Sequence, residues 1–186
     1  MVATTQIALV TAEQFMEMDL GDGNFELVRG EVIRVSPGDC EHGFVCAMIA
    51  FILIGYGKQS GYGRVMSNDS PVRTERNPDT VRGADVMFYS HARLQKSRPM
   101  PKLPNVAPDL TVEVYSPSNR PSEIIGKVHE YLNAGVLMVW VVHPERRNVV
   151  IYRPDDPTPT ILTENDVLED LPELPGFRCS VSEFFE

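Results

Sequence analysis

The run VLMVWVV, from Val136 to Val142, places the tightest limit on how this chain can fold. All seven of its residues are apolar, so a strand built from it would carry apolar side chains on both faces. Such a strand is stable only when packed layers cover both faces, as they do in sheets flanked by helices. The sequence therefore predicts a buried strand with a layer on each side.

Two segments have the pattern of the covering helices. The apolar run FVCAMIAFILI, Phe44 to Ile54, lies inside a helix that we expect from about Glu41 to Lys58, closed by a glycine-rich segment. A second helix is predicted in RPSEIIGKVHEYLNAG, where apolar residues recur at helical spacing and Gly135 can end the helix. The first run is shorter than the roughly 18 residues of a membrane span, so no membrane association is expected.

The remaining elements predict one central sheet. TAEQFMEM has a capping-box pattern for a short N-terminal helix, and FELVRGEVIRV alternates around Arg29-Gly30 as a β-hairpin does. Strands are expected at GRVMS, SPVRT, ADVMFY, DLTVEV, NVVIYR and TILT, with a short basic helix from His91 and a terminal helix at VSEFF. This order favours an α/β or α+β fold with a central mixed β-sheet flanked by helices, forming a single domain over residues 1–186.

Charge and cysteine content narrow the function classes. The three cysteines are few and do not have the spacing of a zinc or disulfide framework, and the start of the chain lacks an export signal, so a cytoplasmic location is expected. The net charge is −9, which opposes general binding to nucleic acid. The segment from Arg64 to Lys102 is an exception, because it holds eight basic and four acidic residues. It could consist of solvated loop charges or could contact phosphates, and Arg73, Arg76 and Arg82 are the candidates for nucleic-acid binding.

Glu113 is the first candidate functional residue, because it lies in the middle of the apolar strand DLTVEV. It could be an exposed or salt-bridged glutamate. A second acid, Asp85, occupies the similar strand ADVMFY, where an unpaired charge would be costly. Two carboxylates on neighbouring strands can share one hard divalent cation such as Mg²⁺. Asp109 is excluded as a partner, since it is four residues from Glu113 on the same strand and so roughly 13 Å away.

These residues resemble the PD-(D/E)XK nuclease-like superfamily, and within it the Uma-type family of bacterial putative restriction endonucleases. The resemblance extends from FELVRGEVI through GADVMFY, PDLTVEVYSPS and the Lys127 helix to VVIYR. It implies a restriction-endonuclease-like fold with an N-terminal helix and β-hairpin. It also implies that Asp85, Glu113 and the backbone carbonyl of Val114 bind Mg²⁺ or Mn²⁺.

The lysine that the superfamily places two residues after the glutamate is replaced by Tyr115, which we keep as a secondary candidate. The resemblance implies that Lys127, on the following helix, supplies the lysine. Its position at the border of the apolar face would let its ammonium reach the strand ends. Lys127 could instead be a surface lysine that pairs with Glu123 or Glu130.

Two N-terminal residues match family positions and are secondary candidates. Glu26 could help to hold the metal or a water molecule. His42 could act in the site, or could be a capping or packing residue near a helix start.

The hypothesis that follows is hydrolysis of phosphodiester bonds, with Asp85 and Glu113 holding the metal and Lys127 orienting the attacking water. The expected substrate is nucleic acid, DNA rather than RNA, and a homodimer is expected because restriction-type domains often pair to reach two strands. The alternative is a catalytically inactive nuclease-like fold that serves as a binding or regulatory module. A glycosidase is less favoured, because the single tryptophan, Trp140, lies in an apolar strand and forms no sugar-binding platform.

Overall fold

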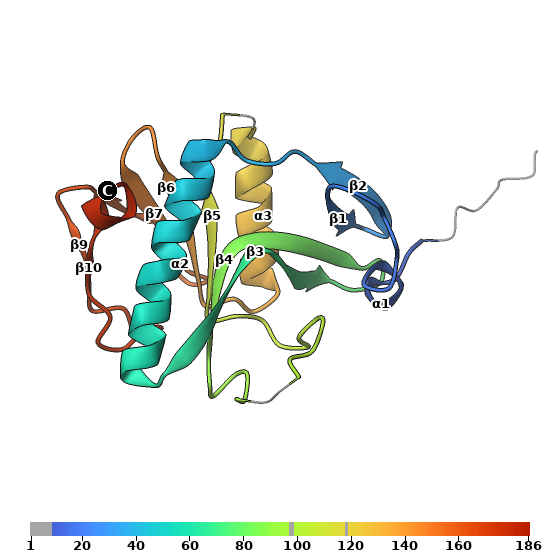
Figure 1. The fold of residues 1–186 in the computed structure, drawn as a ribbon, viewed down its shortest axis with the longest axis horizontal. Coiled ribbons are helices and arrows are strands. Elements are labelled where there is room, and N and C mark those ends of the chain that lie inside the picture. Colours follow the sequence, from blue (N-terminus) through green and yellow to red (C-terminus); the bar gives the residue numbers. More distant parts are fainter. Residues whose placement is uncertain (1–8, 97–98, 118) are drawn as a thin grey trace, which may run out of the picture.

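A mixed β-sheet forms the centre of the computed structural model, which describes residues 9–96, 99–117 and 119–186 (Figure 1). The main path of the sheet has the order β2-β1-β4-β5-β6-β7-β8, and β3 pairs with β4 beside this path. Among the strands in the described residues, β5 and β6 run parallel and the other neighbouring pairs of this sheet are antiparallel. The strands are β1 (Asn24–Val28), β2 (Glu31–Val35), β3 (Gly63–Glu75), β4 (Thr80–Ser90), β5 (Leu110–Val114), β6 (Met138–His143), β7 (Asn148–Tyr152) and β8 (Thr160–Thr163).

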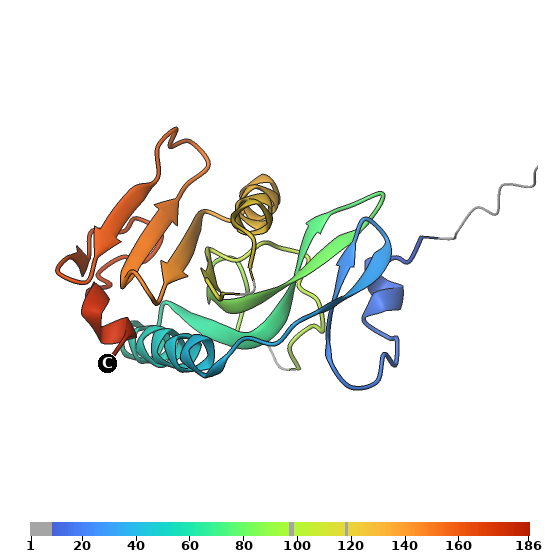
Figure 2. The same cartoon turned by 90° about the horizontal axis from the view of Figure 1, so that it is seen from above.

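Two long helices cover opposite faces of the sheet, as Figure 2 shows from above. Helix α2 (Cys40–Ser60) packs on one face, and helix α3 (Pro121–Asn133) packs on the other. Trp140 belongs to the core on the α2 side, whereas its neighbours Val139 and Val141 belong to the core on the α3 side. The strand predicted to be buried on both faces is therefore β6, and the expected mixed sheet flanked by helices is confirmed.

The N-terminal elements form a separate corner of the molecule. Helix α1 (Ala12–Phe15) has the expected capping box between Thr11 and Gln14, and the expected hairpin is formed by β1 and β2. Arg29 and Gly30 form its turn with φ angles of 50° and 81°. Both central residues of a two-residue hairpin turn of this kind need positive φ, which glycine adopts without steric cost. The hairpin joins the sheet through the pairing of Leu27 with Val81.

Strand β3 is one long strand where the sequence predicted two. Its pairing with β4 is interrupted between Ser67 and Ser70, where Asn68 and Asp69 both have positive φ. Two residues of β3 oppose one residue of β4, and that residue is Asp85. This is a β-bulge, which redirects side chains and ends regular alternation along a strand.

The C-terminal part closes the α2 side of the core. Strands β9 (Val167–Leu168) and β10 (Cys179–Ser180) form a small sheet, followed by a 3₁₀ helix, η1 (Val181–Phe184), where a helix was expected. The prediction of a short basic helix from His91 is wrong, because the described residues 91–96 form turns and bends. The backbone turns at Ser90 instead, and Arg93 uses its guanidinium to donate to the carbonyl groups of Ala107 and Gly135.

Helix α2 is long and apolar enough to cross a membrane by length and composition alone, which for a single helix is weak evidence of a span, and 28% of its apolar window is buried inside the protein. The buried side consists of Val45, Ile49, Ala50, Leu53 and Gly57.

Candidate active site

A cleft of about 1050 Å³ opens between the hairpin, the β3 bulge and the N-terminal ends of α2 and α3. All the acids singled out in the sequence, Asp85, Glu113 and Glu26, line this cleft together with Lys127 and His42. The fold therefore brings residues from two strands of the central sheet, the hairpin and both long helices to one place.

Asp85 lies opposite the bulge, where regular pairing between β3 and β4 is lost. Its Oδ2 accepts a hydrogen bond from the backbone N–H of Val114, with an N···O distance of 2.7 Å, and lies 3.2 Å from Nε2 of His42. The carboxylate therefore holds together β4, β5 and α2. Both of these contacts use Oδ2.

Glu113 is 3% exposed and faces helix α3. The hydroxyl of Tyr131 donates to Oε1 at 2.7 Å, and Nζ of Lys127 lies 3.2 Å from Oε2. Burial, together with repulsion from Asp85, raises the pKa of Glu113 above the ordinary glutamate value even though Lys127 opposes the shift.

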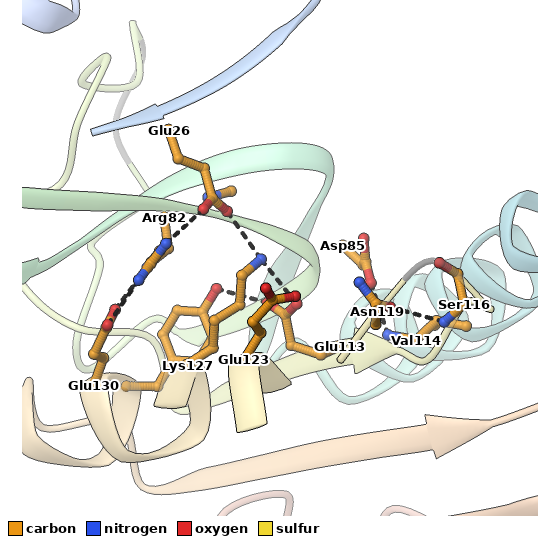
Figure 3. A network of polar contacts seen from close by, with 12 residues as sticks. Glu26, Arg82, Asp85, Glu113, Val114, Ser116, Asn119, Glu123, Lys127 and Glu130 are labelled. Carbon is orange, nitrogen blue, oxygen red and sulfur yellow. Dashed lines mark hydrogen bonds and ion pairs between the residues drawn. The ribbon is translucent and has the colours of Figure 1, made fainter. Parts of the chain in front are cut away.

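A chain of alternating charges supports Lys127, as Figure 3 shows. Its ammonium also lies 2.9 Å from Oε1 of Glu26, and Oε2 of Glu26 accepts from Arg82 at 2.8 Å. Arg82 forms a two-point contact with Glu130 on α3. Burial alone would raise the pKa of Glu26, but Lys127 and Arg82 hold it below its ordinary value. The pairing of Lys127 with Glu26 and Glu113 differs from the surface pairing with Glu123 or Glu130 considered from the sequence.

His42 lies in the first turn of α2, whose capping residue is Asp39. The side chain of Asp39 accepts from the backbone N–H of His42. The imidazole of His42 is directed to Asp85 instead of the helix end. The hydrogen bond with Asp85 raises the pKa of His42 despite its partial burial.

The cleft contains the carboxylate oxygens that a hard divalent cation takes as ligands. Asp85 and Glu113 offer carboxylate oxygens from adjacent strands, and Asp85 contributes to the raised pKa of Glu113, so the two negative charges repel each other. A cation between them would offset both this repulsion and the burial of Glu113. Among the cleft-lining residues, six acids stand against three basic residues: Glu26, Asp39, Asp69, Asp85, Glu113 and Glu123 against Arg34, Arg82 and Lys127.

Other residues named from the sequence lie differently. The hydroxyl of Tyr115 donates to the carbonyl of Asn119, and its ring packs against His143. Of the three arginines considered for nucleic-acid binding, Arg73 pairs with Glu13, and Arg82 pairs with Glu26 and Glu130. Their guanidinium groups therefore contact carboxylates of the protein in this structure. Arg76 is exposed. Asp109 lies at the other end of β5 from the cleft, where its carboxylate accepts a hydrogen bond from the backbone N–H of Ser90. This position agrees with its exclusion as a partner of Glu113.

Three residues near the acids were not singled out from the sequence. Tyr131 follows Lys127 by four residues on one helix, so helical spacing could have identified it. Cys46 has the same spacing from His42, and its Sγ lies 3.6 Å from Nδ1. Asp69 belongs to the bulge, and only the strand pairing brings it beside Asp85.

Comparison with known proteins gives two findings. A sequence model of a family described as "Uma2: Putative restriction endonuclease" matches residues 12–182. A crystal structure described as a "putative nuclease belonging to DUF820", from Anabaena variabilis ATCC 29413, superposes with a TM-score of 0.80 at 16% sequence identity, covering 95% of this chain and 97% of that one. This structural match supports the fold. No curated protein matches the chain.

Proposed function

Because the chain belongs to the Uma2 family of restriction-endonuclease-like proteins, we propose that it is a metal-dependent endonuclease that hydrolyses phosphodiester bonds of nucleic acid. The observation that carries this proposal is the convergence of Asp85, Glu113 and Lys127 in one cleft. The expected substrate is DNA, which restriction endonucleases cut, and the expected location is the cytoplasm.

In this proposal Asp85 and Glu113, with the carbonyl of Val114, hold Mg²⁺ or Mn²⁺. When bound, the ion supplies Lewis-acid polarisation of a phosphate oxygen and lowers the pKa of a bound water. The protein's own groups do the positioning. Lys127 is fixed between Glu113 and Glu26, so its ammonium can orient the attacking water or donate to a phosphate oxygen as negative charge develops. Arg82 keeps Glu26 in place, and His42 keeps Asp85 in place.

The first test is a cleavage assay with supercoiled plasmid, single-stranded DNA and RNA in Mg²⁺, Mn²⁺ or EDTA. Glu113→Gln and Lys127→Met should each lower cleavage by about a hundredfold or more, since loss of one charge-stabilising group has effects of that order. Asp109→Asn is the matched control, because it changes a buried acid at the other end of the same strand. Cleavage that persists in EDTA, or equally in Glu113→Gln, would refute the proposal.

The alternative is a nuclease-like fold that binds but does not cut. The excess of acids in the cleft favours cation binding under either proposal, and Tyr115 at the superfamily's lysine position favours the inactive form. A protein that binds Mn²⁺ through Glu113 but leaves every substrate intact would establish this alternative.

We also propose a homodimer, and the exposed side of α2 supports it. Phe44, Phe51 and Ile54 are 44%, 71% and 40% exposed on this side. They belong to a row whose members follow at alternating steps of four and three residues, the spacing of helices that pack side by side in coiled coils. We call this row the α2 seam: Cys40, Phe44, Ala47, Phe51, Ile54 and Lys58.

A second copy of the chain fits the α2 seam in one antiparallel register centred on Ile49. In that register Phe44 faces Ile54 of the second copy, and Phe51 faces the small Ala47. Glu41 comes next to the oppositely charged Lys58, so the charges at the helix ends are complementary. Gly43 and Gly55 flank the seam with open space around them, which permits close approach of two helices.

A further inference from the structure

We propose that His42, Cys46 and Asp85 form a site for a thiophilic transition-metal ion such as Zn²⁺, and that this site shares Asp85 with the proposed Mg²⁺ site. The consequence for activity rests on the proposed nuclease function, whereas binding of the ion does not. The ligand types differ from those of the main site, because a thiol sulfur and an imidazole nitrogen join a single carboxylate.

The three side chains lie close enough together for small side-chain rotations to bring them around one ion. His42 and Cys46 are four residues apart on α2 and so share a helix face, and Asp85 reaches them from β4. Nε2 of His42 is 3.2 Å from Oδ2 of Asp85 and 3.9 Å from Sγ of Cys46, and all the ligand atoms lie within 4.8 Å of one another. A tetrahedral Zn²⁺ with bonds of about 2.0 Å to nitrogen and oxygen and 2.3 Å to sulfur places such neighbours roughly 3.3 and 3.6 Å apart.

The surroundings hold the imidazole in this position. Gly38 lies directly against the His42 ring, and a Cβ at this glycine would overlap the ring atoms. The backbone N–H of His42 is fixed by Asp39 at the start of the helix. The ring is therefore confined between the loop before α2 and the carboxylate of Asp85.

The site has the open form of an exchangeable metal site. His42, Cys46 and Asp85 all line the cleft, so a fourth position would face solvent and could take water or a phosphate oxygen. Thiolate and imidazole ligands favour Zn²⁺ over Mg²⁺, which prefers oxygen ligands. An ion bound here would occupy Asp85 and so compete with Mg²⁺. We therefore expect Zn²⁺ to inhibit the nuclease through Cys46.

The direct test uses Co²⁺ as a probe, because a cysteine thiolate bound to Co²⁺ gives a charge-transfer absorption that oxygen and nitrogen ligands do not give. Metal-free wild type should show this band with one equivalent of Co²⁺, and Zn²⁺ should displace it. Cys46→Ser should abolish the band, and His42→Ala should weaken Co²⁺ binding at least about tenfold. Cys40→Ser is the matched control, since it changes an exposed cysteine on the same helix.

A band that is absent in wild type, or that is kept in Cys46→Ser, would overturn the proposal. Circular dichroism checks that each variant is folded, and a retained helical signal with no band in Cys46→Ser supports the assignment. This experiment needs no activity, so it remains decisive even if the protein does not cut nucleic acid.

A second arm measures inhibition where Mg²⁺-dependent cleavage is present. The Zn²⁺ concentration that halves cleavage should rise at least about tenfold in Cys46→Ser relative to Cys40→Ser, each compared with its own activity in Mg²⁺ alone. Equal sensitivity of the two variants would overturn the competitive role.

Discussion

Glu113 is held by two residues of one helix, so Tyr131 as well as Lys127 acts on the acid. Tyr131 is fully buried and donates its hydroxyl to Oε1. This hydrogen bond favours the ionised form of Glu113 and partly opposes the rise in its pKa caused by burial. Without the hydroxyl, the carboxylate would keep a proton more readily and would bind a cation less well.

We therefore expect Tyr131→Phe to lower Mn²⁺ affinity and cleavage together. Loss of a hydrogen bond to a charged group should also lower the free energy of unfolding by about 1.5 to 3 kcal/mol. Tyr89→Phe is the matched control, because Tyr89 is buried and its hydroxyl donates to the carbonyl of Val106. Calorimetric Mn²⁺ titration and urea unfolding measure the two effects. Equal Mn²⁺ affinity in both variants would show that Tyr131 has only a packing role.

The sequence identifies the acids of the cleft better than their partners. Asp85 and Glu113 can be recognised because a carboxylate in an apolar strand is costly unless something compensates it. Lys127 follows from the resemblance to a family. Arg82 could not be assigned, since a basic residue in a polar segment has no local sign that it will pair with Glu26 from the hairpin and Glu130 from α3. Its partners are 56 and 48 residues away.

Strand β3 shows which features of the elements could be predicted. Its residues alternate as strands do, and the sequence therefore predicts strands before and after Asn68-Asp69. The bulge between them depends on pairing with β4, so no local pattern shows that the two halves form one strand. Helices α2 and α3 were predictable because their apolar residues and end signals are local. The turn after His91 was not, because Arg93 is held by carbonyl groups of distant loops.

The α2 seam leads to a prediction for Phe51→Glu. Phe51 is the most exposed large apolar residue of the seam, and the register places it against Ala47 of the second copy. A charge at this position would be buried without a partner, so the variant should be a monomer under conditions where wild type is a dimer. Sedimentation equilibrium or light scattering measures the mass.

Met18→Glu is the control, because Met18 is 44% exposed and lies outside α2, between α1 and β1. A dimeric Phe51→Glu would contradict the proposed interface. A wild type that is monomeric and instead binds phospholipid vesicles through α2 would assign the exposed apolar side to a membrane surface, and so would also contradict it.

The excess of acids in the cleft links metal binding to the stability of the whole molecule. Buried carboxylates that repel one another destabilise the metal-free protein, and a cation that binds only the folded state stabilises it. At a Mg²⁺ concentration a hundred times the Kd, the free energy of unfolding should rise by about 2.7 kcal/mol. For a chain of this size that corresponds to an increase in Tm of roughly 5 to 10 °C.

Differential scanning calorimetry in Mg²⁺ and in EDTA tests this link. Wild type and Asp109→Asn should both gain stability on addition of Mg²⁺, whereas Glu113→Gln should gain little. Equal gains in Glu113→Gln would place the bound ion elsewhere on the protein. No gain in wild type at millimolar Mg²⁺ would count against a metal site of useful affinity.

The net charge of −9 also determines how the protein can bind nucleic acid. Phosphates approaching the cleft meet more acids than basic residues, and Arg82 is already occupied by two glutamates. A divalent cation in the cleft would offset most of this negative charge and give the phosphate a direct partner. We therefore expect binding of a labelled DNA duplex to require a divalent cation, independently of cleavage.

Fluorescence anisotropy measures the affinity for the duplex, which can be compared between Ca²⁺, a hard cation with oxygen ligands, and EDTA at equal ionic strength. Binding should be at least about tenfold tighter in Ca²⁺, and Glu113→Gln should lose this difference while Asp109→Asn keeps it. Equal affinity in EDTA would mean that exposed basic residues such as Arg76 bind the phosphates without help from the cleft.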